Sequence, residues 1–156
     1  MNISKKKKLL TAQLNENFEA LEKSLDVLNY SFRKCKSFGE KEEYEQEEQE
    51  SFEALTSRFA RTSDILTQKV FKSLFALLQE NVNTIIDSAN ILEKLGIVEN
   101  ADDVLNIREL RNQIAHEYVE ADLNALFMDV LRYVPAIETV VNNLKKYIDN
   151  QFLSKS

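Results

Sequence analysis

The chain has 156 residues, a formal net charge of −6, two glycines, one proline, one cysteine and one histidine. This length suits one domain that buries a core without disulfides or a metal. Scarce glycine and proline argue against a sheet, whose tight turns need such residues. The negative charge argues against broad, sequence-independent nucleic-acid binding, which depends on neutralising phosphates. We therefore expect a single all-α domain over residues 1–156, an antiparallel bundle of five or six helices.

The cysteine and histidine counts exclude whole classes of site. Cys35 alone cannot form an internal disulfide, and one cysteine with one histidine cannot complete a zinc site within one chain. No apolar run approaches the roughly 20 residues that span a bilayer, and the residues after Lys5–Lys8 do not form a signal-peptide core. We expect no metal, no cofactor and no membrane partner, and a soluble protein of the cytoplasm.

The first predicted helix covers residues 5–36, and Gly39 is its expected stop. Its apolar side chains recur at alternating spacings of four and three residues, which is typical of one buried helix face. They are Leu14, Phe18, Leu21, Leu25, Leu28 and Phe32. At a rise of 1.5 Å per residue, such a helix is roughly 45 Å long, comparable with the whole domain.

Residues 40–50 carry seven acidic side chains in eleven positions. Such a run suits either an acidic docking surface or a solvated connector that leads into exposed first turns of the next helix. We favour the connector, because charge runs are most often solvated. We also expect this segment to be the most flexible part of the domain.

Helical spacing restarts at Phe52 and continues to Leu77, but the polar run Thr62-Ser63-Asp64 interrupts it. These three residues fit an N-cap that divides the segment into two helices, and they equally fit a polar patch on one long helix. The sequence leaves both alternatives open. A further helix is expected from Asn83 to Leu95, closed by Gly96.

Two more helices are expected before the C-terminus. One starts at Asn100, where Asp102 and Asp103 lie near the positive end of its dipole. Asp122 is the expected cap of a last helix that runs to about residue 150. Pro135 lies inside that helix and should kink it or divide it, because proline lacks the backbone N–H.

The residues best suited to chemistry lie between Arg108 and Tyr118. On a helical wheel Arg111 falls within the apolar stripe, whereas His116 points about 140° away. A guanidinium in that stripe needs a partner, a cleft or a second subunit. Arg111 is therefore either a functional residue or an arginine whose stem packs while its head reaches a carboxylate. His116 is the only histidine, the residue type most used for acid–base chemistry near neutral pH.

The eight residues from Arg111 to Tyr118, Arg-Asn-Gln-Ile-Ala-His-Glu-Tyr, resemble the Arg-x4-His-x-Tyr motif of HEPN-domain proteins, in particular HepT-like toxins. Asn112 after the arginine matches the same pattern, and the helical layout is similar over most of the chain. The resemblance implies a HEPN-like fold and a metal-independent endoribonuclease that works as a homodimer. It implies catalytic roles for Arg111 and His116, with Asn112 and Arg108 in support.

Two facts predict that such a site is completed across a dimer. Cleavage of RNA by its own 2′-hydroxyl needs a base, an acid and a cation that stabilises the phosphorane, and one chain has a single histidine. On a regular helix, Arg111 and His116 also point in different directions. Either the helix breaks before His116, long side chains swing together, or a second subunit supplies the missing groups.

The resemblance also implies a regulator. HepT-like toxins are similar in being encoded with a small nucleotidyltransferase antitoxin that adenylylates the motif tyrosine, here Tyr118. The added phosphate would block Arg111. Related HEPN proteins suggest an alternative, a non-catalytic helical adaptor or substrate-binding subunit of a nucleotidyltransferase. A plain helical dimer without a ligand is a third possibility, and it requires that Arg111 is salt-bridged internally.

Overall fold

The computed structural model describes residues 2–116 and 123–153, and all regular structure in these ranges is helical. The elements are α1 (Ile3–Lys36), α2 (Gln46–Asp64), the π-helical segment η1 (Ile65–Val70), α3 (Phe71–Leu77), α4 (Ile85–Lys94), α5 (Ala101–His116), α6 (Leu123–Ile148) and the π-helical segment η2 (Asp149–Leu153). The predicted all-α bundle is confirmed. Because α2, η1 and α3 follow one another without a break, they form one long rod.

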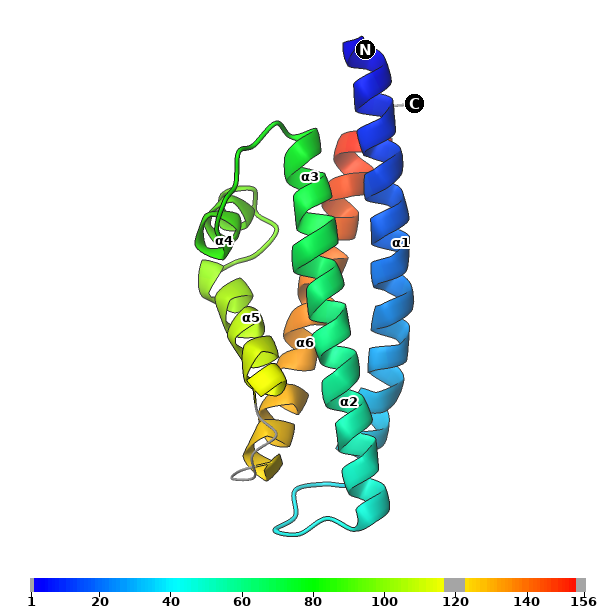
Figure 1. Cartoon of the computed structure of the whole chain (residues 1–156), viewed down its shortest axis with the longest axis vertical. Coiled ribbons are helices and arrows are strands. Elements are labelled where there is room, and N and C mark those ends of the chain that lie inside the picture. Colours follow the sequence, from blue (N-terminus) through cyan, green and yellow to red (C-terminus); the bar gives the residue numbers. More distant parts are fainter. Residues whose placement is uncertain (1, 117–122, 154–156) are drawn as a thin grey trace.

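Consecutive long helices run antiparallel, and the start of α1 and the end of α6 lie at the same end of the molecule (Figure 1). The α2–η1–α3 rod returns beside α1, and all three of its parts contact α1. The α5 helix packs against α2 and α6, and the short α4 packs on α5. Within the described ranges, no helix is long and apolar enough to cross a membrane.

The predicted apolar stripe of α1 forms one wall of the core. Its first five residues are buried, and Phe32 is half-buried against them. Polar side-chain pairs join α1 to the returning rod, among them the bond from Arg58 Nη1 to Ser31 Oγ over 2.7 Å and two that lie further along the contact. Asn17 Nδ2 donates to Ser73 Oγ over 2.6 Å, and the hydroxyl oxygens of Ser24 and Thr62 lie 2.6 Å apart. Because sliding either helix by one turn would break these pairs, they specify the register of this contact.

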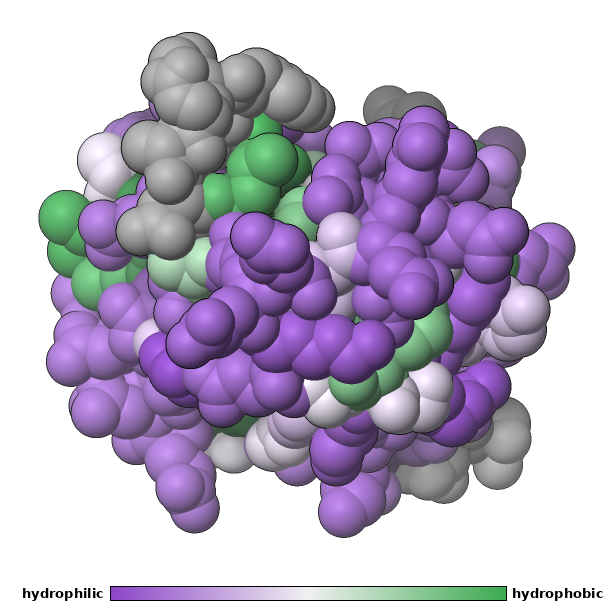
Figure 2. All heavy atoms as spheres, turned by 90° about the horizontal axis from the view of Figure 1, so that it is seen from below, coloured by the Kyte–Doolittle hydropathy of each residue, from purple (hydrophilic) through white to green (hydrophobic). Residues whose placement is uncertain are grey.

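The acidic segment connects α1 to α2 and also forms the first turn of α2. Most of its side chains are exposed, but Tyr44 is buried. The Tyr44 hydroxyl donates to the Gly39 carbonyl over 2.9 Å and accepts from the Lys41 N–H over 3.1 Å. Its ring packs edge-on against Phe52, which stacks on Phe127 of α6. Hydrophilic residues cover most of the surface at this end (Figure 2).

The polar run Thr62-Ser63-Asp64 lies inside one long helix and does not divide two. Hydroxyl groups here bond to carbonyls one turn earlier. Thr62 Oγ1 donates to the Arg58 carbonyl over 2.8 Å, and Thr67 Oγ1 donates to the Ser63 carbonyl over 3.0 Å. Such bonds compete with the helical ladder. They flank the point where the helix widens into the π-helical η1, a geometry that is frequent at functional sites.

Two expectations about α6 have different outcomes. Asp122, its predicted cap, lies outside the described residues. Pro135 does not divide the helix, so that alternative is wrong: α6 is continuous from Leu123 to Ile148. The missing N–H costs one ladder bond, and burial of the same face on both sides of the proline offsets that cost. The buried face comprises Phe127, Val130, Val134, Ile137, Val140, Val141, Leu144 and Ile148.

The predicted helix stops at Gly39 and Gly96 are confirmed, and both glycines adopt a left-handed conformation, with φ of +74° and +77°. After α4, the N–H of Ile97 donates to the Leu92 carbonyl over 3.0 Å, which is the long bond of a Schellman motif. The end of α3 uses the same motif, but Gln79 occupies its left-handed position with φ of 60°. An L-residue is strained in this conformation.

These two helix ends predict opposite effects of glycine on stability. We expect Gly96→Ala to lower the free energy of unfolding by about 1 kcal/mol, because a Cβ there meets no other atom within 4 Å and only the left-handed backbone is penalised. Gln79→Gly should raise it by roughly 0.5 kcal/mol, the relieved strain less the greater entropy of an unfolded glycine. Urea unfolding followed by circular dichroism measures both. A loss of stability in Gln79→Gly would contradict the strain argument.

Candidate functional site

The α5 helix carries the predicted site residues that the structure describes. Its start follows the prediction: Asn100 Oδ1 accepts from the Asp102 N–H over 2.9 Å, and the acidic side chains occupy the first turn. One face of the helix is buried in the core. That face comprises Val104, Ile107, Leu110 and Ile114. Burial of this face determines which direction every other side chain of α5 takes.

Arg111 forms a bidentate ion pair with Asp64 at the end of α2. Arg111 Nε lies 2.7 Å from Asp64 Oδ1, and Arg111 Nη2 lies 2.9 Å from Asp64 Oδ2. The arginine side chain is 29% exposed and the aspartate side chain 38%. The hydrogen bonds that Arg111 donates to Asp64 raise the pKa of Arg111 above its ordinary value; burial opposes this shift, and the charge of Asp64 adds to it. The expectation that this guanidinium needs a partner is confirmed.

Asp64 is the residue of this contact that sequence reasoning missed. The sequence alone predicts its run only as a cap or a polar patch. The buried positions of that run are Thr62 and Ser63, whereas the Asp64 side chain is 38% exposed at the end of α2. The apolar spacing of α2 therefore carries no signal for the contact with Arg111.

An open groove of about 450 Å³ lies beside Arg111, between α2 and α5. The ion pair uses the Nε donor and one Nη2 donor, so three of the five N–H donors of the guanidinium remain for a ligand. Except for Glu53, the lining side chains are uncharged and mostly small, so they leave the guanidinium accessible. Besides Arg111, they are Glu53, Thr56, Ser57, Ala60, Ile114 and Ala115.

His116 is exposed at the last residue of α5, and Asn112 is exposed one residue after Arg111. The helix is regular through His116, which removes the alternative in which it breaks before the histidine. Within one chain, His116 therefore lies on a different side of α5 from the Arg111 groove. The structure does not bring the two predicted catalytic residues together in a single subunit.

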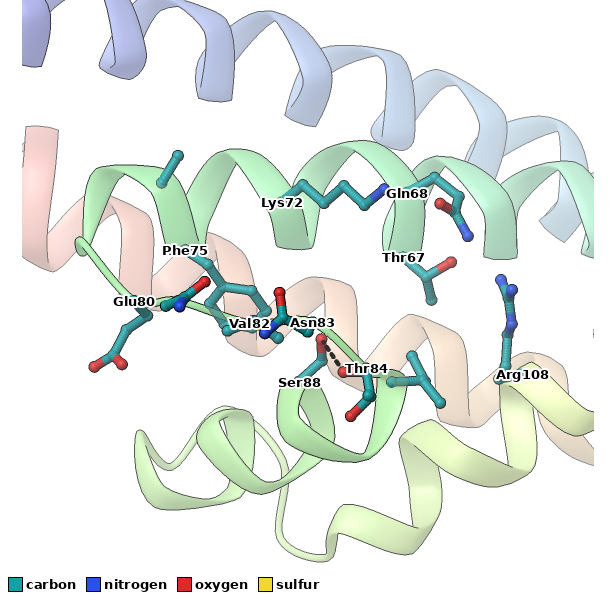
Figure 3. A pocket seen from close by; sticks show the side chains of 13 residues that line it. Thr67, Gln68, Lys72, Phe75, Glu80, Val82, Asn83, Thr84, Ser88 and Arg108 are labelled. Atoms are coloured by element: carbon teal, nitrogen blue, oxygen red, sulfur yellow. Dashed lines mark hydrogen bonds between the residues drawn. The ribbon is translucent and has the colours of Figure 1, made fainter.

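Arg108 lies one helical turn before Arg111 but faces a different cavity. That cavity has a volume of about 400 Å³ and lies between the η1–α3 part of the long rod and the α4–α5 pair (Figure 3). Lys72 also lines it. In one chain, Arg108 and Arg111 thus line two separate cavities on the two sides of α5.

Other candidate residues add little to this site. Burial raises the pKa of the Cys35 thiol to about 11, with Lys34 opposing the shift, so the thiol is neutral and a poor nucleophile. Across residues 2–116 and 123–153, no three side chains of histidine, cysteine, aspartate or glutamate gather to hold a metal ion. Tyr118 lies outside the described residues.

Comparison with known proteins adds no assignment to this geometry. No protein-family model matches the chain, and no curated protein matches it significantly. The HEPN-like identity therefore stays a prediction from the sequence motif.

The Arg111–Asp64 pair predicts a measurable coupling energy. We expect Arg111→Gln and Asp64→Asn each to lower the free energy of unfolding by about 1 kcal/mol, with a coupling of roughly 0.5–1 kcal/mol in a double-mutant cycle, because the pair is bidentate but about one-third exposed. The pair Arg132–Asp129, which is 3.2 Å apart and more exposed, is the matched control and should couple by less than about 0.5 kcal/mol. Equal coupling energies in the two cycles would contradict a special role for Arg111 in holding α5.

Proposed function

We propose that the chain is a metal-independent endoribonuclease that works as a homodimer and cleaves RNA by attack of the 2′-hydroxyl. The observation that carries this proposal is the setting of Arg111. Asp64 holds its guanidinium beside an open groove, and three of its N–H donors make no bond to Asp64. A charge fixed in advance stabilises a phosphorane without reorganising during the reaction. The planar fork of arginine also matches phosphate oxygens in pairs.

In this proposal, His116 of one protomer removes the proton of the 2′-hydroxyl, whose oxygen attacks the adjacent phosphorus. The bond to the 5′-oxygen breaks, and that oxygen takes a proton from His116 of the partner subunit. The products are a 2′,3′-cyclic phosphate and a 5′-hydroxyl. The exposure of His116 at the end of α5 is compatible with contact to a second subunit. Asn112 would orient the phosphate, while Arg108, in its separate cavity, would contact a neighbouring part of the RNA.

The direct test is cleavage of single-stranded RNA by purified protein in EDTA. We expect His116→Ala to slow the initial rate by about 10²–10⁴-fold and Arg111→Gln by about 10²–10³-fold. Arg61→Gln removes an exposed arginine of α2 and serves as the charge-matched control with an unchanged rate. A product ending in a 2′,3′-cyclic phosphate would identify the 2′-hydroxyl as the nucleophile. Undiminished cleavage in both site variants would contradict the assignment of Arg111 and His116 as catalytic residues.

A mixing experiment on the same activity tests the two-histidine site. Wild-type and His116→Ala chains are mixed at constant total concentration and allowed to exchange subunits. If each site needs both histidines, activity falls with the square of the wild-type fraction, because mixed dimers are inactive. A linear fall would show that each site needs only one histidine and would reject the two-histidine mechanism.

The proposal includes a regulator, a nucleotidyltransferase antitoxin that adenylylates Tyr118. After incubation with ATP and a minimal nucleotidyltransferase encoded beside this chain, mass spectrometry should find one adenylyl group on Tyr118. RNA cleavage should fall in parallel, because the added phosphate competes for Arg111. Tyr118→Phe should keep its cleavage activity under the same treatment. Equal inactivation of Tyr118→Phe would contradict this mode of control.

Two observations favour alternatives without catalysis. The net charge of −6 opposes RNA binding and suits a non-catalytic helical adaptor or substrate-binding subunit of a nucleotidyltransferase. The internal ion pair with Asp64 meets the condition for a plain helical dimer without a ligand, because it accounts for Arg111 as a structural residue. Wild-type protein that does not cleave RNA but forms a stable complex with the nucleotidyltransferase would establish the adaptor. Failure of both assays would leave the plain helical dimer.

A further inference from the structure

The cavity that Arg108 faces has a volume of about 400 Å³, which falls in the usual range for a small-molecule site, although its wall is more polar than most. Thr67 and Gln68 come from the π-helical η1, so the widened stretch of the long rod forms part of the wall. The α3 helix adds Lys72 and Phe75, and the α3–α4 connection adds Asn83 (Figure 3).

Two cationic side chains line this cavity from opposite walls: Arg108 extends from α5, and Lys72 lies along α3 with its amine near Gln68 (Figure 3). Within the described ranges, the ion pairs of the protein include neither of them. Glu80 is the acidic lining residue, and Figure 3 shows it at the opposite end from Arg108 with its carboxylate directed away from both cations. This hollow is therefore locally positive in a protein whose net charge is −6.

The amino end of α4 adds to that positive potential. Thr84 caps the helix, with its side chain accepting from the Asp87 N–H over 3.1 Å, and both Thr84 and Ile85 line the cavity. The positive end of the α4 dipole thus opens on the hollow that Lys72 and Arg108 line, although Asp87 in the first turn of α4 offsets part of its potential. A helix amino end and an arginine are both suited to phosphate oxygens.

The rest of the wall is rich in amides and hydroxyls. Gln68, Asn81 and Asn83 each offer both donors and an acceptor. Two hydroxyls already donate to backbone carbonyls, Thr67 to Ser63 over 3.0 Å and Ser88 to Thr84 over 3.3 Å, so their oxygens remain as acceptors. Such a lining suits a polyol ligand, whose hydroxyl groups it can hydrogen-bond, better than it suits a flat apolar ring as ligand.

From these observations, we propose that the cavity binds a sugar phosphate. Its phosphate would lie among Arg108, Lys72 and the amino end of α4, and its hydroxyl-bearing body would lie against the amides toward Asn83. The inference does not rest on the ribonuclease proposal: that proposal depends on Arg111 and the groove beside α2, uses Arg108 only for an additional RNA contact, and is tested with RNA, which is absent here.

The test is calorimetric titration of the intact protein, without RNA, with ribose 5-phosphate as the probe. We expect saturable binding at least tenfold tighter than that of inorganic phosphate or ribose, because each of those ligands engages one end of the cavity only. Arg108→Gln and Lys72→Gln should each weaken binding about tenfold, the effect of one charge-assisted hydrogen bond. Asn83→Ala should weaken ribose 5-phosphate but leave inorganic phosphate unchanged.

The exposed Lys69, one turn before Lys72 and absent from the cavity wall, provides the matched control: Lys69→Gln should bind like wild type. Circular dichroism confirms that each variant is folded. Lack of saturable binding to ribose 5-phosphate, or equal weakening by Lys69→Gln and Arg108→Gln, would overturn the proposal. Tighter binding of adenosine monophosphate than of ribose 5-phosphate would replace the sugar-phosphate assignment with a nucleotide site.

Discussion

A guanidinium in the buried stripe of a helix has to be paired, and the α2–α5 side of this bundle is organised around that requirement. Asp64 meets it from the end of α2, immediately before the helix widens into η1. Removing either partner would leave the other charge partly out of water. Burial of the apolar face of α5 sets the rotation of the helix about its axis, and the pair reinforces it. That rotation in turn directs Arg111 to the groove beside α2 and Arg108 to the cavity beside α4.

Much of the fold could be predicted because its signals are local. The stripe on α1 needs only the spacing of its own apolar residues, and Gly39 and Gly96 mark helix ends through their own backbone freedom. Pro135 shows where a local rule fails. The rule considers one lost hydrogen bond, whereas the outcome depends on the apolar face that α6 buries on both sides of the proline.

The site was less predictable because its contacts are distant in sequence. The apolar stripe of α5 predicts that Arg111 needs a partner. Asp64 lies 47 positions away, however, and the residue spacing within either helix does not indicate which residue of the other helix it meets. Arg108 shows the same limit. A helical wheel separates it from Arg111, but the cavity it faces exists only because α4 and η1 approach one another there. Thr62-Ser63-Asp64 was ambiguous for a related reason, since its hydroxyls bond to the carbonyls of its own helix.

The balance between global and local charge constrains what either hollow can hold. Screening limits charge effects to about 10 Å at roughly 0.1 M salt, so Arg108, Lys72 and Arg111 act on a phosphate mainly at contact. The net charge of −6 repels a long polyanion on approach and gives it no steering. A small phosphate ester is repelled much less and can be held by two or three fixed donors. An RNA substrate of this protein would therefore be bound through a few phosphates at α5, with geometry and not overall charge supplying the affinity.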